Sequence, residues 1–291
     1  MQYDLDFLLS PEHAGEAWKL LRDRGYRQLS SEAGPTDHLP PLVRKTGWEW
    51  RGDFFDVEIP AAIELHYRLW DTEFERIPIQ PRPDPLSRLE MRDGCPVLCL
   101  QDQLLHCVLH FMRHLFRGSV RLSHLYEIAW FLDQRASDAG FWSEWTAEHS
   151  PETRVLAATC FRLASQVFNC PTGAIEGEIG NIPAAAARWL QYYWRSVVMP
   201  DKWPKAEVLL QVSLAPRRRD WPVILRRRLL PLSFPGPVDA LYLPPEQLTL
   251  RRRVVAGARH ARYAATRAGH HLRGLASFVR LAALRPREPL A

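Results

Sequence analysis

The sequence predicts an α+β protein with a small sheet domain, an all-helical domain and a basic helical tail. The hydrophobic pattern has a period of two near the N-terminus and a period of 3.6 after Leu100, and the C-terminal part is rich in arginine. A length of 291 residues fits two domains or one large one. We predict a sheet domain over residues 1–95, a helical domain over 96–215, and a Pro/Arg-rich linker with a basic helix over 216–291.

The first predicted strand covers Tyr3–Leu9, where apolar and acidic residues alternate. Because a strand has a period of two, Asp4 and Asp6 leave the same face. The following Ser10–Glu12 segment is a helix start, with a serine N-cap, a proline in the first turn and an acid. This helix should place Ala14, Ala17, Leu20 and Leu21 on its apolar side and stop at Gly25, before a short strand over Tyr26–Leu29.

The second clear strand covers Ile63–Leu69. Its polar face consists of Glu64, His66 and Arg68, and its apolar face consists of the residues between and beside them. Weaker strand patterns lie around Trp48–Val57. The proline-rich segment Pro78–Pro96 is typical of a linker.

Five helices are expected in the helical domain, over Asp102–Phe116, Ser119–Arg135, Phe141–Glu148, Glu152–Phe168 and Ala184–Val198. Prolines cluster again after Pro216, which indicates a second linker. A heptad-like stripe dominated by alanine then predicts one long helix over Arg251–Leu284.

The charge of the chain is unevenly distributed. The segment from Pro216 to the C-terminus holds 16 arginines and four acids, a net charge of +12, which leaves −7 for the first 215 residues of a chain whose total is +5. For the arginine-rich helix, packing on the protein's own helices or on a partner protein is the favoured interpretation. Binding of phosphate groups, including RNA, through residues 251–284 comes second, and a membrane-surface helix comes third.

Composition also limits the cellular environment. The five cysteines form no C-x-x-C pair, so reduced thiols are expected rather than a disulfide scaffold. No apolar run approaches the ~18 residues of a membrane span, and the first residues do not form a basic, apolar leader. These features predict a cytoplasmic protein without a membrane span.

Asp4, Asp6 and Glu64 are the candidates for a metal site. Two carboxylates on one strand face repel each other, and a divalent cation removes that cost. A third carboxylate from a neighbouring strand would complete a set of hard oxygen ligands suited to Mg²⁺. Asp56 or Glu58 would replace Glu64 if the register were shifted by an even number of residues, whereas Asp53 is expected on a solvated face.

Several motifs in order give the chain a family resemblance. They are Y-D-L-D-F-L-L at Tyr3–Leu9, the Ser-Pro-Glu helix start, Gly25-Tyr26, H-L-P-P-L at His38–Leu42, I-E-L-H-Y-R-L at Ile63–Leu69, His106 and His110 with His114, and L-Y-E-I at Leu125–Ile128. Over roughly the first 135 residues this ordered set resembles the uncharacterised nucleotidyltransferase family, part of the polymerase β-like nucleotidyltransferase superfamily.

The resemblance implies a mixed sheet of nucleotidyltransferase type with flanking helices. It implies Mg²⁺ bound by Asp4, Asp6 and Glu64, and transfer of a nucleoside monophosphate from an NTP to an acceptor, which the sequence does not identify as a small molecule, a protein or RNA. Glu64 would bind or polarise the metal on the acceptor side, or act as a base. Contacts with substrate are implied for His66, Arg68, His38 and His110.

One family feature does not occur in this sequence. In the superfamily a Gly-Ser or Gly-Gly turn lies about a dozen residues before the Asp-x-Asp strand and binds the triphosphate through backbone N–H groups. Here Asp4 follows only three residues, so we expect an N-terminally shortened sheet domain with an exposed edge at the first strand. The alternative function is therefore a catalytically inactive binding protein of this fold that acts through its basic C-terminal region.

His106, His110 and His114 form a ladder with four-residue spacing, at which two imidazoles can share Zn²⁺. Residue 107 is cysteine, so the glutamate of the H-E-x-x-H hydrolase motif is missing. We favour a packed interdomain helix whose histidines form hydrogen bonds or line a cleft, in contact with nucleotide or acceptor rather than zinc.

Overall fold

The computed structural model describes residues 4–28, 37–44, 46–48, 56–81, 83–199, 205–230 and 249–283. The chain divides into two compact units. The sheet unit comprises Met1–Asp71 with Ser233–His270, and the helical unit comprises Thr72–Leu232 with His271–Ala291. The first unit thus ends at Asp71, whereas the sequence predicted a boundary at residue 95. Contacts with the helices connect part of the segment after Asp71 to the helical unit: the Arg88 guanidinium donates to both oxygens of Asp102 at 2.7 and 2.8 Å.

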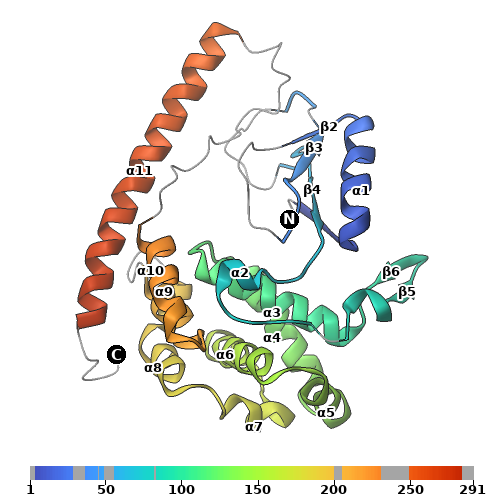
Figure 1. Cartoon of the computed structure of the whole chain (residues 1–291), viewed down its shortest axis with the longest axis vertical. Helices are drawn as coiled ribbons and strands as arrows, with labels where there is room; N and C mark the ends of the chain where they lie inside the picture. The colour runs from blue at the N-terminus through green and yellow to red at the C-terminus, as the bar shows by residue number, and fades with distance from the viewer. Residues whose placement is uncertain are drawn as a thin grey trace. The chain divides into compact units, whose positions relative to one another are not determined.

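The sheet unit contains a four-stranded mixed sheet (Figure 1). Its order is β1-β4-β3-β2, with β1 at Asp4–Leu8, β2 at Tyr26–Gln28, β3 at Leu42–Arg44 and β4 at Ala62–His66. β1 pairs with β4 in parallel, and the other two pairs are antiparallel. A small mixed sheet followed by helices confirms the α+β class.

Helix α1, Pro11–Asp23, follows β1 and contacts β2 and β4. Ser10 lies at the N-cap as expected, but its hydroxyl contacts His13 Nδ1 at 2.8 Å instead of capping a backbone N–H. Gly25 follows the helix with a φ of 92°, a conformation that favours glycine and ends the helix as expected. Of the expected apolar side, Ala14 is buried, but Leu20 is 52% exposed and does not face a core.

Two strand predictions differ from the structure. β4 ends at His66 rather than Leu69, because the N–H of Tyr67 bonds to the carbonyl of Asp37 and leaves the strand ladder. Around Trp48–Val57 the described residues contain no strand; the indole of Trp48 donates to Asp56 at 2.9 Å, and Asp56 in turn accepts the N–H of Glu58. Residues 49–55, with Asp53, lie outside the described residues, as do Tyr3, Leu29 and Leu284.

β1 is the outer strand of the described sheet. Its face opposite the aspartates carries Leu5 and Phe7, which are 42% and 48% exposed. The predicted alternation of acidic and apolar residues is therefore present in β1. However, its apolar face is exposed and does not pack into a core.

The helical unit contains most of the helices. Its helices of eight residues or more, apart from the end of α11, are α3 Leu100–Phe116, α4 Leu122–Arg135, α5 Ala139–Glu148, α6 Pro151–Phe168, α8 Ala184–Tyr193, α9 Ala206–Leu214 and α10 Trp221–Leu229. The shorter ones are α2 Thr72–Glu75, α7 Glu176–Ile179, and 3-10 turns at Pro85–Arg88, Gly173–Ile175, Trp194–Val197 and Arg218–Asp220. The five predicted helices correspond to α3, α4, α5, α6 and α8, with α4 starting three residues later than predicted.

Both predicted linkers contain regular structure. In the first, β5 Glu90–Arg92 and β6 Cys95–Val97 form a hairpin (Figure 1). Its two-residue turn is Asp93-Gly94, with positive φ angles of 50° and 78°, a sequence and geometry typical of tight hairpins. In the second, α10 buries Ile224 and packs on α9. Proline content alone therefore did not predict the hairpin or α10; residues 231–248 of the second segment lie outside the described residues.

A buried ionic network joins segments of the helical unit that are distant in the sequence. The carboxylate of Glu75 on α2 is fully buried and accepts hydrogen bonds from Arg117, Arg228 and Gln211 at 3.0, 2.6 and 3.1 Å. The aromatic ring of Phe74 lies within 5.4 Å of three guanidinium groups, those of Arg117, Arg227 and Arg228. These contacts fix α2 against α9 and α10.

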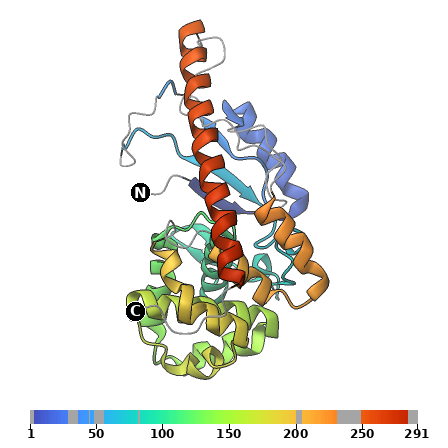
Figure 2. The ribbon, with the colours of Figure 1, turned by 90° about the vertical axis from the view of Figure 1, so that its left-hand side faces the viewer.

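Helix α11, Leu250–Ala283, is a single long helix (Figure 2). Its C-terminal part contacts the helical unit, since His271 Nε2 lies 2.9 Å from the carbonyl oxygen of Leu229 and Gly274 packs against Lys205. That contact agrees with the favoured interpretation, packing on the protein's own helices, for this part of α11. Among the described residues, no helix combines the length and apolarity needed to cross a membrane.

Candidate active site

Asp6 and Glu64 lie side by side on one face of the sheet. Asp6 is the direct register partner of Glu64 in the parallel pair of β1 and β4. Side chains of paired residues in neighbouring strands point to the same face, so the two carboxylates come together without help from a loop. The register thus places Glu64, the residue predicted as the third carboxylate, beside Asp6.

His66 completes a three-residue cluster on this face. It lies two residues after Glu64 on β4, and its Nε2 is 3.4 Å from Asp6 Oδ1 and 3.5 Å from Glu64 Oε2. One candidate ligand atom from each of the three residues lies within 4.8 Å of the others. The imidazole is only 4% exposed, while the two carboxylates keep about a fifth of their surface open to solvent. A buried imidazole thus supports two accessible acids.

The charge state of Glu64 depends on opposing effects. Burial raises the pKa of its carboxyl, but the hydrogen bond with His66 and the charge of His38 act against burial. The net result is a pKa below its usual range, so Glu64 is ionised at neutral pH. Asp6 raises the pKa of Glu64, which is the like-charge repulsion that a bound cation would relieve.

His38 is held beside this cluster by backbone hydrogen bonds. The N–H of Leu39 donates to the carbonyl of Leu65, so the segment runs along the end of β4. The ring of His38 lies 5.0 Å from the ring of His66, centroid to centroid. Its Nδ1 donates to the carbonyl of Leu39 at 2.8 Å, which fixes the ring orientation. The H-x-P-P-L motif therefore positions a second imidazole at the site.

The remaining predicted site residues are not members of the cluster of Asp6, Glu64 and His66. Asp4 lies two residues before Asp6 on the same face of β1, and its register partner in β4 is Ala62. Arg68 follows the end of β4, is exposed, and places its guanidinium 5.2 Å from the ring of Tyr67. His110 belongs to the helical unit and lies on α3. Asp56 is bonded to Trp48 and Glu58 is exposed, so neither takes the place of Glu64 beside Asp6.

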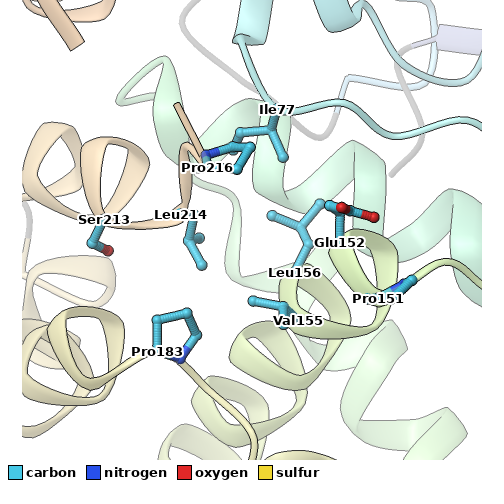
Figure 3. Close-up of a pocket in the computed structure, with 9 residues that line it drawn as sticks. All are labelled: Ile77, Pro151, Glu152, Val155, Leu156, Pro183, Ser213, Leu214 and Pro216. Atoms are coloured by element: carbon cyan, nitrogen blue, oxygen red, sulfur yellow. The ribbon is translucent and has the colours of Figure 1, made fainter. Parts of the chain in front are cut away.

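The helical unit has a cavity of different chemistry, with a volume of about 250 Å³. Apolar side chains from α6 and α9, together with Ile77 and prolines, converge on it (Figure 3). Glu152 is the single charged residue of its lining. A lone carboxylate among apolar groups does not form a polyvalent cation site, so the acidic cluster of the sheet unit is the candidate for catalysis.

The comparison with protein families identifies the fold. The model of the uncharacterised nucleotidyltransferase family matches residues 1–169, more than half of the chain. The chain belongs to this family. The match begins before the strand of Asp6 and continues through α6, so it includes both the acidic cluster and the histidines of α3. Neither a curated protein nor a solved structure matches the chain.

Membership of a nucleotidyltransferase family gives the chain a general nucleotidyltransferase role, with a nucleotide as substrate. Enzymes of this class generally use divalent metals, and the donor set fits that requirement. Asp6 and Glu64 supply the hard carboxylate oxygens that Mg²⁺ prefers. The imidazole of His66 is a poorer ligand for Mg²⁺, and its position between the two carboxylates suits a group that orients them.

The structure adds one histidine to those that the sequence analysis considered. His124, in the first turn of α4, lies next to His110 and His114, with its ring centroid 4.4 and 5.2 Å from theirs. The spacing of His106, His110 and His114 pointed to α3 alone. The short connection between α3 and α4 is the one feature that could have indicated a neighbour on the next helix, because short connections join antiparallel helices.

Proposed function

We propose that this chain transfers a nucleoside monophosphate from an NTP to an acceptor, with Mg²⁺ bound by Asp6 and Glu64 and assisted by Asp4. The observation that supports this proposal best is the register of β1 and β4, which pairs Asp6 with Glu64. Mg²⁺ neutralises phosphate charge and brings the acceptor oxygen into line when it is bound.

The residues of the chain would then mainly position the reactants. His66, almost fully buried, keeps the two carboxylates converged and prevents them from turning apart. The lowered pKa of Glu64 keeps it ionised at pH 7, which suits a metal ligand better than a general base poised near neutrality. His38 and Arg68 add basic groups on and beside this end of β4, where they are available for phosphate oxygens.

Mg²⁺-dependent binding of NTPs tests the proposal without knowledge of the acceptor. Calorimetry with each NTP in Mg²⁺, and electron paramagnetic resonance with Mn²⁺ in its place, should show a site that Asp6→Asn and Glu64→Gln each weaken by about tenfold or more, the cost of one lost charged ligand. Asp23→Asn, an exposed carboxylate on α1, is the matched control and should bind as the wild type does.

Pyrophosphate release then separates binding from transfer. Release should require Mg²⁺ and should fall in the Asp6→Asn variant in proportion to its occupancy or more. Equal NTP binding and equal pyrophosphate release by wild type and Asp6→Asn would reject the metal site and the mechanism together.

A second candidate function is RNA binding through α11 by a catalytically inactive protein. Helix α11 has eight arginines and no acidic residue, and most of its residues are exposed. Arg259, Arg262 and Arg273 fall on one side of the helix at 100° per residue. RNA affinity should fall steeply with salt, and the triple arginine-to-glutamine variant should lower the slope of log K against log salt by about 2 to 3. An unchanged slope would contradict RNA binding and favour a partner protein.

A further inference from the structure

Three histidines of the helical unit converge between two helices. His110 and His114 are one turn apart on α3, and His124 lies in the first turn of α4. The Nε2 atoms of His110 and His114 are 3.1 Å apart, and one ring nitrogen of each of the three residues lies within 4.8 Å of the others. Two Zn–N bonds of about 2.0–2.1 Å at tetrahedral or octahedral angles separate their nitrogens by roughly 3 Å, so the pair of His110 and His114 already has the spacing of two ligands of one ion.

Ser119 fixes the orientation of the His114 ring. Its hydroxyl donates to the carbonyl of His114 at 3.4 Å and therefore accepts from Nδ1 of the same residue at 3.1 Å. With the proton on Nδ1, the lone pair of Nε2 points toward His110. A hydrogen bond to the far nitrogen is the usual support of a metal-bound histidine, because it sets both the tautomer and the direction of the ring.

The protonation state also fits. Burial, together with the charge of Arg113, lowers the pKa of His110 far below its usual range and lowers that of His114 to about 4. Both rings are therefore neutral at pH 7, the form that binds metals. Arg117 and Arg121 add positive charge around His114. This charge works against any dication, so the affinity must come from the imidazole nitrogens, which suit Zn²⁺ and other transition metals better than Mg²⁺.

We propose that His110, His114 and His124 bind one transition-metal dication, Zn²⁺ in the first place, and thereby join α3 to α4. Three imidazoles leave a fourth position of a tetrahedral ion for water. All three ligands of this site belong to the helical unit, whereas Asp6 and Glu64 belong to the sheet unit. It differs from the ladder of α3 alone, since His124 replaces His106 as the third ligand.

Cobalt and zinc titrations of the full-length protein test this site. In an Asp6→Asn/Glu64→Gln background, which removes the carboxylates of the proposed Mg²⁺ site, Co²⁺ should bind at one equivalent and produce visible absorption that Zn²⁺ abolishes. His124→Asn should remove this absorption, and Ser119→Ala should weaken binding about 10- to 100-fold through loss of ring orientation. His270→Asn, an exposed histidine of α11, is the matched control and should change nothing.

Two results would overturn the proposal: equal Co²⁺ binding with and without His124, or absorption that appears only when Asp6 and Glu64 are intact. If the His124 variant does not fold, NMR of the protein with all its histidines intact still tests the site. In the same background, Co²⁺ should shift the ring protons of His110, His114 and His124 furthest, with a smaller shift for His106, which stacks on His110. Shifts of none, or of His66 and His38 instead, would also refute the site.

Discussion

Substitution of Glu75 by glutamine should destabilise the helical unit, because it removes a buried carboxylate that pairs with both Arg117 and Arg228. Glu75 is fully buried, and Arg228 and Arg117 are 11% and 23% exposed. Breaking a buried ion pair on one side typically costs about 3–5 kcal/mol, since the remaining charge stays desolvated. Burial already lowers the pKa of Arg228, which marks it as the partner that loses most.

The expected cost lies at the lower end of that range, about 3 kcal/mol. Glutamine keeps one acceptor oxygen, which can still bond to Gln211 or Arg228, and Arg117 is exposed enough to be hydrated after the charge is lost. Replacing Arg228 by methionine in addition should recover part of the loss, because the most deeply buried unpaired charge is then gone. The coupling energy of this double-mutant cycle should be about 1–3 kcal/mol.

Denaturant unfolding followed by near-ultraviolet circular dichroism measures this effect, since buried Trp142, Trp145 and Trp189 report on the helical unit. Glu90→Gln is the matched control: Glu90 pairs with Arg92 at 2.9 Å, but both side chains are nearly half exposed, so a change below about 0.5 kcal/mol is expected. A loss of less than about 1 kcal/mol in Glu75→Gln, or no coupling with Arg228, would refute the reasoning.

Two further predictions concern titration. Burial raises the pKa of the Cys107 thiol to about 12, so at pH 8 iodoacetamide should label exposed Cys95 and leave Cys107 unmodified in mass spectra of the folded protein; the opposite order would contradict the packing of α3. Burial against Trp145 lowers the pKa of His149, so the stability it contributes is present above its unfolded pKa of about 6.5 and is lost as the pH falls below that value. His149→Gln should reduce the fall in unfolding free energy between pH 6.5 and 5, and an unchanged slope would show that another group is responsible.

The main features of the sheet site were predictable because side chains along a strand alternate strictly between the two faces of the sheet. The alternation of Tyr3–Leu9 and Ile63–Leu69 puts Asp6, Glu64 and His66 on polar faces, and a parallel register then brings those faces together. The sequence could not show which residues stand opposite one another. That choice placed Asp4 opposite Ala62, and the end of β4 at His66 separated Arg68 from the cluster.

Features that depend on packing between distant segments were not predictable. His124 joins His110 and His114 through the crossing of α3 and α4, and no spacing along one helix predicts a residue on the next. The hairpin β5–β6 was missed because prolines were given more weight than the Asp93-Gly94 dipeptide, which favours a tight turn by its tolerance of positive φ. Helix α10 was missed for the same reason, although a proline in the first turn is compatible with a helix.

The helical unit extends beyond the C-terminal end of the family match. The match ends at residue 169, where Asn169 adopts a left-handed conformation that ends α6. Glu75 lies within the matched segment, but Gln211 and Arg228, two of its three side-chain donors, lie beyond it. A buried carboxylate that loses two donors is costly, so α9 and α10 are structural components of the helical unit rather than an appended linker. The histidines of α3 are therefore supported by a unit that extends some sixty residues beyond the family match, through Leu229 at the end of α10.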